Sequence, residues 1–398
     1  MKARTLLITI TIISIGFTSC TPKESAWQGT IEEVDGVTVV KNPLNPMSGD
    51  NGNLKLEESF TIDFEKDELA EVGISDIGGF DVDSEGNVYF WCFVSSENLI
   101  YKFNSQGRFL ISFGHQGQGP GELESPTMLR INEKDEIIVS ERRRARLIIF
   151  NTNGNLIKEI PTAPNQQDIT TLLENETILA LEANFIPEEG VTQMPIVLRN
   201  IELETIITLH PGYKIPNWVR AKEINGVRTD IAWFPWSISS GNIYIGNDEN
   251  GYELLVFNLD GTLIRKIQKE YNPVPVQESV KEAVLKAILL PELEQFKIKD
   301  KISFPENMPP FQYFFTDDAG RLYVMTFEQG EKPEEYIYDI FNPEGLFIGR
   351  MSLDNSGNEV TAKWGGPFEA KARSNHLYSL RIKTSGYMEL VVYKMIWH

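Results

Sequence analysis

The chain of 398 residues carries 57 acidic and 37 basic residues, which gives a formal net charge of −20. Such a surface repels phosphate backbones, so the composition argues against nucleic acid as a partner. Hydrophobic residues make up 41% of the chain, which is enough for several ordinary domains or for one large repeat architecture.

Residues 1–19 have the features of an export signal peptide. Lys2 and Arg4 precede the apolar run "TLLITITIISIGF", which is too short for a membrane span. The run ends in "FTSC", which resembles a bacterial lipoprotein signal, although Phe17 stands where Leu is usual. We therefore expect a signal peptide over 1–19, lipidation of Cys20 and a tether over 20–29. Plain secretion with an ordinary cleavage site is the alternative.

A unit of four strands follows the tether. The stretch "GGFDVDSEGNVYFWCFVSSENLIYKFNSQGRFLISFG" (78–114) has turns, "DSEGN" and "NSQG", with the Asp, Asn and Gly that tight hairpins require. "DVDSEG" also imitates the start of a calcium-binding loop, but the twelfth position of that loop is Cys92, where a bidentate Glu is needed. The pattern therefore predicts a hairpin turn, and Cys92 is expected to be a buried, inert thiol.

The stretch "FGHQGQGPGELESP" (113–126) is expected to join the outermost strand of this unit to the innermost strand of the next. Its glycines allow backbone angles that other residues avoid. It does not match a phosphate-binding loop, because no Lys-Ser/Thr pair follows and Glu122 stands at the last glycine position of G-x-G-x-x-G. A crossing loop is the main interpretation. A direct ligand role for His115 or Glu122 is the alternative.

The cluster "ERRRAR" (141–146) lies on the loop between the middle strands of the second unit, on the same face as the glycine loop. Two interpretations of Arg142, Arg143 and Arg144 stay open. They receive a carboxylate or sulfate, or they pair with neighbouring Glu residues, which we favour.

The four-strand pattern recurs with turns about 50 residues apart, which is typical of a β-propeller. The further copies span residues 127–160, 170–209, 236–267 and 313–353, and the copy at 170–209 lacks the turn glycines. A sixth copy, 367–397, has only three strands, and residues 54–64 are expected to supply its fourth strand and close the ring. The sequence therefore predicts a six-bladed propeller over 30–398, with seven blades if residues 30–41 contribute to another unit.

One helix is predicted over "VQESVKEAVLKAILL" (276–290), ended by Pro291. It forms an insertion of about 276–299 between blades four and five. Among the aromatic residues before blade four, Trp233 and Trp236 are expected to pack between blades. Trp218 lies in a long loop and is the best candidate for a sugar or peptide platform.

The first repeat and its loop, "DSEGNVY…NLIYKFNSQGRFLISFGHQGQGPGELESP", resemble the NHL-type repeat. Together with the lipoprotein signal and the helical insertion, they resemble the six-bladed β-propeller lipoproteins of Bacteroidetes. The resemblance implies an all-β propeller of four-stranded blades in a bacterial envelope. Thr21 is not the Asp that commonly holds lipoproteins at the inner membrane, so we expect an outer-membrane lipoprotein on the periplasmic or the exposed side. The resemblance implies no activity and no catalytic residues.

The sequence therefore favours a lipid-anchored, non-enzymatic binding or scaffold module for a glycan, peptide or protein partner. Top-face loops are long and bottom-face turns are short, so a ligand is expected at the top. The candidate contacts are His115, Glu122, Arg142, Arg143, Arg144, His210 and Trp218.

No catalytic residue, metal or cofactor is predicted, and H-E-x-x-H and G-x-S-x-G motifs are absent from the sequence. His115 and His210 both fall on loops that lead from rim to centre, so a site of two histidines and a carboxylate stays open. A metal-assisted lyase or hydrolase at the top of the channel is the alternative function.

Overall fold

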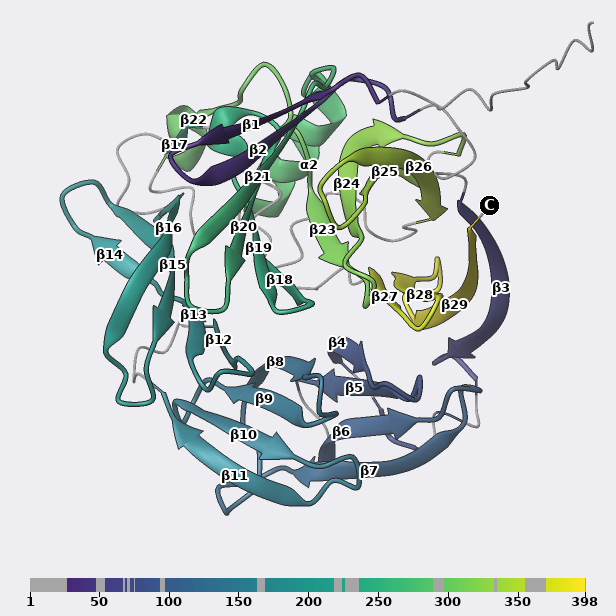
Figure 1. Cartoon of the computed structure of the whole chain (residues 1–398). Helices are drawn as coiled ribbons and strands as arrows, with labels where there is room; N and C mark the ends of the chain where they lie inside the picture. The colour runs from purple at the N-terminus through teal and green to yellow at the C-terminus, as the bar shows by residue number, and fades with distance from the viewer. Residues whose placement is uncertain are drawn as a thin grey trace, which may run out of the picture.

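The computed structural model describes residues 27–47, 54–66, 69, 72–74, 76–93, 97–162, 169–217, 224–225, 236–288, 297–332, 335–354 and 370–397. Six sheets are arranged around a central channel, as the sequence predicts (Figure 1). In blades one to five the four main strands run outward in chain order from the channel to the rim, and in blade six the outermost strand comes from the N-terminal part of the chain. Successive strands are joined by short turns, and this local pairing follows directly from the turn motifs of the sequence.

The first three blades contain the following strands. Blade one has β4 (Ile77–Val82), β5 (Val88–Cys92), β6 (Asn98–Phe103) and β7 (Phe109–His115). Blade two has β8 (Pro126–Ile131), β9 (Ile137–Glu141), β10 (Arg146–Phe150) and β11 (Leu156–Pro161). Blade three has β12 (Ile169–Leu172), β13 (Ile178–Leu181), β15 (Val191–Arg199) and β16 (Thr205–Pro216), and β14 (Asn184–Ile186) pairs with β15.

The other three blades complete the ring. Blade four has β18 (Trp236–Ser239), β19 (Asn242–Gly246), β20 (Glu253–Asn258) and β21 (Leu263–Lys269), with the 3₁₀ helix η2 (Asp248–Asn250). Blade five has β23 (Tyr313–Thr316), β24 (Leu322–Gln329), β25 (Glu335–Phe341) and β26 (Phe347–Asp354). Blade six has β27 (Ala370–Arg373), β28 (His376–Ile382), β29 (Met388–Trp397) and β3 (Leu54–Asp63).

The N-terminal strand β3 closes the ring, which confirms the predicted closure. β3 pairs antiparallel with β29, from Leu54 opposite Trp397 to Asp63 opposite Glu389. Blade six thereby gains its fourth strand from the other end of the chain.

Residues 30–41 do not start a seventh blade. They form the hairpin of β1 (Thr30–Val34) and β2 (Val37–Asn42), and β2 pairs in parallel with β21 at the outer edge of blade four. The Asn42 side chain donates to the carbonyls of Gln268 and Gly345, so this hairpin also joins blade four to blade five.

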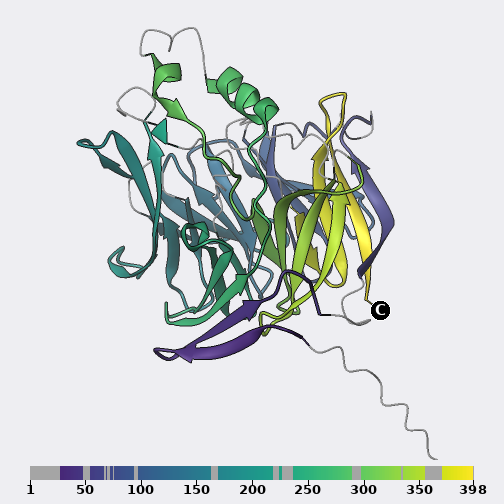
Figure 2. The same ribbon diagram turned by 90° about the horizontal axis from the view of Figure 1, so that it is seen from above.

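The connection between blades four and five contains the predicted insertion. Its helix α2 spans Glu278–Ile288, and η4 (Ile298–Lys301) and β22 (Ile302–Ser303) follow. β22 pairs with β17 (Ile224–Asn225) from the loop before blade four. Figure 2 shows α2 on one side of the ring and the β1–β2 hairpin on the opposite side. We call the side with α2 the upper face. The opposite side, which carries the short turns within the blades such as "DSEGN" and "NSQG", is the lower face. Within the described ranges, no helix has the length and apolar character needed to cross a bilayer.

Several lower-face turns are held by an Asp or Asn side chain at the first position. In "DSEGN" the Asp83 carboxylate accepts from the amides of Glu85 and Asn87 and, at 3.0 Å, from the Tyr89 hydroxyl. The carboxylate that resembled a calcium ligand is therefore used by the turn, and the hairpin prediction is confirmed. Burial, followed by the nearby Asp83 charge, raises the pKa of Tyr89.

In blades one, two, four and five, the glycine of the turn between the two outer strands packs on the preceding blade. A Cβ added to Gly154, which has φ 78°, would lie 2.6 Å from the Phe113 ring of blade one. The glycine therefore satisfies both a left-handed backbone and a close approach. Blade three lacks this glycine, and Leu203 takes the left-handed conformation with φ 69°.

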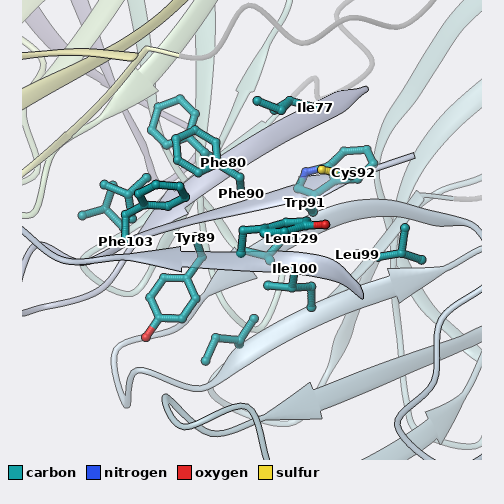
Figure 3. Close-up of a cluster of buried hydrophobic side chains, with 14 of the residues drawn as sticks. Ile77, Phe80, Tyr89, Phe90, Trp91, Cys92, Leu99, Ile100, Phe103 and Leu129 are labelled. Carbon is teal, nitrogen blue, oxygen red and sulfur yellow. The ribbon is translucent and has the colours of Figure 1, made fainter. Parts of the chain in front are cut away.

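The cores lie between neighbouring blades. Figure 3 shows the cluster between blade one and its neighbours, in which Phe80, Phe90 and Phe103 are fully buried. Cys92 is buried in the same cluster, as the sequence predicts. Trp236 also packs in a core, between blades three and four.

Candidate functional site

The glycine loop and the arginine cluster meet on the upper face. The loop leaves blade one at His115, the last residue of β7, and enters blade two at Pro126, the first residue of β8. The arginine loop joins β9 to β10, the middle strands of blade two. The two predicted positions are therefore confirmed. We call residues 116–125 and 142–145 together the upper platform.

The buried carboxylate of Glu141 fixes the upper platform from below. Glu141 is 1% exposed and accepts hydrogen bonds from the amides of Glu124 at 2.7 Å, Ser125 at 2.9 Å and Arg143 at 3.2 Å. A loop that turns this tightly leaves several amides without backbone partners, and a buried carboxylate satisfies them well. Sequence reasoning treated Glu141 only as part of a charged run and did not identify it as this acceptor.

Further hydrogen bonds tie the two loops together. The Arg144 guanidinium donates to the Gln118 carbonyl, and the Arg142 amide donates to the Ser125 carbonyl at 3.1 Å. Below them, Arg146 donates to the Glu122 carbonyl at 2.7 Å and pairs with Glu159 at 2.7 Å. The two loops therefore form one structural unit. Pairing with Glu was expected for Arg142, Arg143 and Arg144, but Arg144 contacts the backbone of the glycine loop, and the arginine shown here to pair with a Glu is Arg146.

Glu122 has a structural partner in its own loop. Its carboxylate accepts from the Gly119 amide at 2.6 Å and so closes the turn around Pro120. The next residue, Leu123, is fully buried and anchors the loop in the core. Glu122 therefore supports the shape of the upper platform.

The remaining candidates of this region are exposed. The side chains of His115, Arg142, Arg143 and Arg144 all reach solvent on or beside the upper platform. Guanidinium groups bind carboxylates and sulfates through paired N–H donors. The arrangement is therefore suited to an anionic group.

His210 lies apart from this set. It is 3% exposed, its Nδ1 accepts from the Gly212 amide at 3.0 Å, and its Nε2 lies 3.4 Å from Asn247 Oδ1. Because Nδ1 is an acceptor, the ring carries its proton on Nε2 and bonds within the protein. The structure thus places His210 in the interior and not on the upper surface. Trp218 and Cys20, the other two residues singled out in the sequence, lie outside the described residues.

The channel contains a cavity of about 240 Å³ lined by the innermost strands. Its polar side chains link neighbouring blades. Lys371 lies 3.2 Å from Asp81, Arg130 lies 2.7 Å from Glu174, and the Ser237 and Thr316 hydroxyls are 2.7 Å apart. Sequence reasoning missed these residues, because only the closed ring brings the innermost strands together. We interpret these ion pairs and hydrogen bonds as contacts that join neighbouring blades around the channel.

The described residues contain no group of three or more His, Cys, Asp or Glu side chains placed to hold a metal ion. The metal-assisted alternative therefore stays a prediction from the sequence.

The ring and its platform define an all-β protein of the six-bladed propeller class. Residues 86–184 match the model of the family described as "6-bladed beta-propeller" (DUF5128), which confirms the resemblance to six-bladed propellers. No curated protein matches the sequence.

Several solved structures are similar to the chain at low identity. A protein of Bacteroides fragilis described as exported is 11% identical with a TM-score of 0.49, and 89% of this chain and 99% of that chain are covered. A DUF4221 member from Bacteroides vulgatus is 10% identical with a TM-score of 0.45, covering 88% and 100%. The virginiamycin B lyase of Staphylococcus aureus is 12% identical with a TM-score of 0.36, covering 85% and 88%. At such identities these likenesses carry no statement about activity.

Proposed function

We propose that the chain is a lipid-anchored binding module of a bacterial envelope whose upper platform recognises a carboxylate- or sulfate-bearing ligand. The observation that carries this proposal is the fixing of the two loops by Glu141, with the Arg142, Arg143 and Arg144 side chains exposed above it. These three consecutive arginines are exposed although the chain as a whole carries a net charge of −20.

The rigidity of the upper platform supports a binding role. Loops that are already ordered lose little conformational freedom when a ligand binds, so more of the contact energy appears as affinity. Hydrogen bonds from guanidinium to an anion are also about twice as strong as neutral ones. A glycan with uronate or sulfate groups and an acidic peptide share this chemistry.

The anchor rests on the sequence pattern and agrees with the position of the hairpin. The expected tether at 20–29 leads into β1, and the β1–β2 hairpin lies on the side of the ring opposite α2 (Figure 2). An acylated Cys20 would then leave the upper face pointing away from the membrane. Mass spectrometry of the purified mature protein is expected to find an acylated N-terminal Cys20. An unmodified amino terminus at another residue would contradict it.

The ligand proposal is tested by titrating the protein with a sulfated heparin oligosaccharide and with a polyglutamate peptide. The double variant Arg142→Ala/Arg143→Ala is expected to bind the preferred probe at least about tenfold more weakly, with a weaker salt dependence. Arg108→Ala is the matched control, because Arg108 is an exposed arginine on a lower-face turn. Absence of binding to both probes, or an equal loss in the control, would contradict the proposal.

A further inference from the structure

The outermost strands of blades one, two and three expose apolar side chains near their starts. Leu110 of β7 is 46% exposed, Ile157 of β11 is 46% exposed and Ile206 of β16 is 54% exposed. The full set, which we call the apolar edges, comprises Phe109, Leu110, Ile111, Leu156, Ile157, Ile206 and Ile207.

Within each strand these exposed apolar residues are consecutive in the chain. Their exposure therefore does not alternate between a core face and a solvent face. In β7, Phe109, Leu110 and Ile111 are exposed on both faces of a strand that has a neighbouring strand on only one side. A free strand edge that also carries uncharged apolar side chains is a template for pairing with another strand. Figure 1 shows β7 and β11 along the rim of the ring, outside every other strand of their blades.

On the other three blades, the described part of the chain shows no such apolar edge on the outermost of the four blade strands. On blade four, Leu263 and Ile264 are half-buried because β2 lies along β21 and buries Val39 and Val40. On blade five, the chain after β2 reaches β26, and the Met47 amide donates to the Phe347 carbonyl at 3.0 Å.

Blade six is protected in a different way. Its outermost strand β3 exposes the charged residues Lys55, Glu57 and Glu58, which disfavour pairing with another chain. Among the described residues, the N-terminal segment therefore covers the edge of blade four and contacts the start of β26 on blade five, the edge of blade six is charged, and no strand lies along the apolar edges of the other three blades.

We propose that the apolar edges of blades one to three are docking sites for an extended β-strand of a partner protein, which adds in parallel as β2 does on β21. The pairing of β2 with β21 on blade four indicates what kind of segment would bind. By analogy, the partner would supply a short extended segment with β-branched apolar side chains, like "VTVVKN" of β2. Backbone hydrogen bonds supply affinity in this mode, and alternate side chains supply specificity.

A second copy of the chain is a poorer occupant. Two other described edge strands expose large apolar side chains. β14 exposes Phe185 but has only three residues, and β1 exposes Ile31 and Val34 but also places Glu32 and Glu33 in the same five residues. Adjacent carboxylates on an edge are a protection against self-pairing.

The test uses a synthetic peptide with the β2 sequence, residues 36–43, and follows hydrogen exchange of the whole folded domain. The peptide is expected to slow exchange at residues 109–112, 156–158 or 205–208. The variant Leu110→Lys/Ile157→Lys/Ile206→Lys is expected to bind about tenfold more weakly. Ile31→Lys is the matched control, since it changes an exposed apolar residue on the protected edge, and it is expected to bind like the parent. Circular dichroism and thermal unfolding establish that each variant is folded.

Three outcomes would overturn the proposal. The first is no change in exchange at any apolar edge with the peptide at about millimolar concentration, a level at which weak strand pairing is detectable. The second is equal binding of the parent and the triple lysine variant. The third is concentration-dependent dimerisation of the parent, measured by light scattering and abolished by the triple variant, which would assign the edges to a second copy.

Discussion

The Lys269 ammonium lies 3.3 Å from the Asp339 carboxylate in the junction between blades four and five, where the two side chains are 1% and 0% exposed. The Tyr252 hydroxyl at 3.0 Å and the Arg350 Nε at 2.9 Å also donate to Asp339. Burial lowers the pKa of Lys269 and raises the pKa of Asp339, because each charge is removed from water. The charges are therefore tolerated only because they compensate one another.

Removing the shared acceptor is predicted to be the most damaging change at this junction. Asp339→Ala leaves Lys269 and Arg350 without their buried partner and is expected to lower the free energy of unfolding by about 3–5 kcal/mol. Lys269→Met is expected to cost less, because Asp339 keeps Arg350 and Tyr252. Urea unfolding of the two variants checks the order. A larger loss in Lys269→Met would show that the pair, and not Asp339, is the centre of the network.

The upper platform is predicted to depend on one buried carboxylate. Glu141→Ala leaves the Glu124, Ser125 and Arg143 amides without their acceptor, at a cost of about 1–3 kcal/mol for each group left buried and unpaired. Hydrogen exchange at residues 116–125 is expected to become faster. Glu133→Ala removes an exposed lower-face carboxylate and serves as the control. Unchanged exchange in Glu141→Ala would mean that the loop is held by other contacts.

Ring closure is predicted to require β3 and not the β1–β2 hairpin. Deletion of residues 21–66 exposes the edge of β29 and is expected to cause aggregation or loss of cooperative unfolding. Deletion of residues 21–43 keeps β3 and is expected to leave a folded monomer. Light scattering and thermal melting distinguish the two. A monomeric 21–66 deletion that melts like the parent would refute the role of β3.

Asp63, the last residue of β3, is predicted to make the stability of the folded protein decrease at acidic pH. Desolvation raises the pKa of Asp63, but hydrogen bonds from the Glu65 amide and the Lys383 ammonium outweigh it, so the pKa lies below its ordinary 3.8. A lowered carboxyl pKa in the folded state gives stability that is present above pH 3.8 and is lost as the pH falls through the lowered value.

The variant Asp63→Asn tests this dependence on pH. It is expected to be less stable than the parent at pH 7 and to lose less stability on acidification to about pH 3, because the asparagine does not titrate there. Denaturant melts at a series of pH values measure the difference. Parallel pH profiles for the two proteins would contradict the prediction.

The blades could be predicted because their turns are local. "NSQG", "NTNG", "NLDG" and "NPEG" each place a glycine where the backbone needs positive φ, and this requirement is visible in a few residues. Blade three was the faintest repeat in sequence because Leu203 occupies that position. The β1–β2 hairpin was not assignable to blade four, because its parallel pairing with β21 joins distant segments and leaves no local pattern.

The sequence predicted the position of the upper platform but not the hydrogen bonds that hold it. Long loops and arginines located it, whereas the burial of Glu141 and the turn-closing bond of Glu122 depend on how two loops fold against each other. His210 shows the same limit. His210 was expected on a rim-to-centre loop, but it lies within β16, where the neighbouring blade, with Asn247, covers it.

The pairing of β3 with β29 has a consequence for how the protein is made. The two strands are far apart in the chain, so the ring cannot close until Trp397 has been synthesised. Contacts between such distant segments form slowly, because closing a long loop costs conformational entropy before any pairing offsets it. During that interval β3 has no partner strand. Its charged residues Lys55, Glu57 and Glu58 then disfavour aggregation of the incomplete chain with other chains.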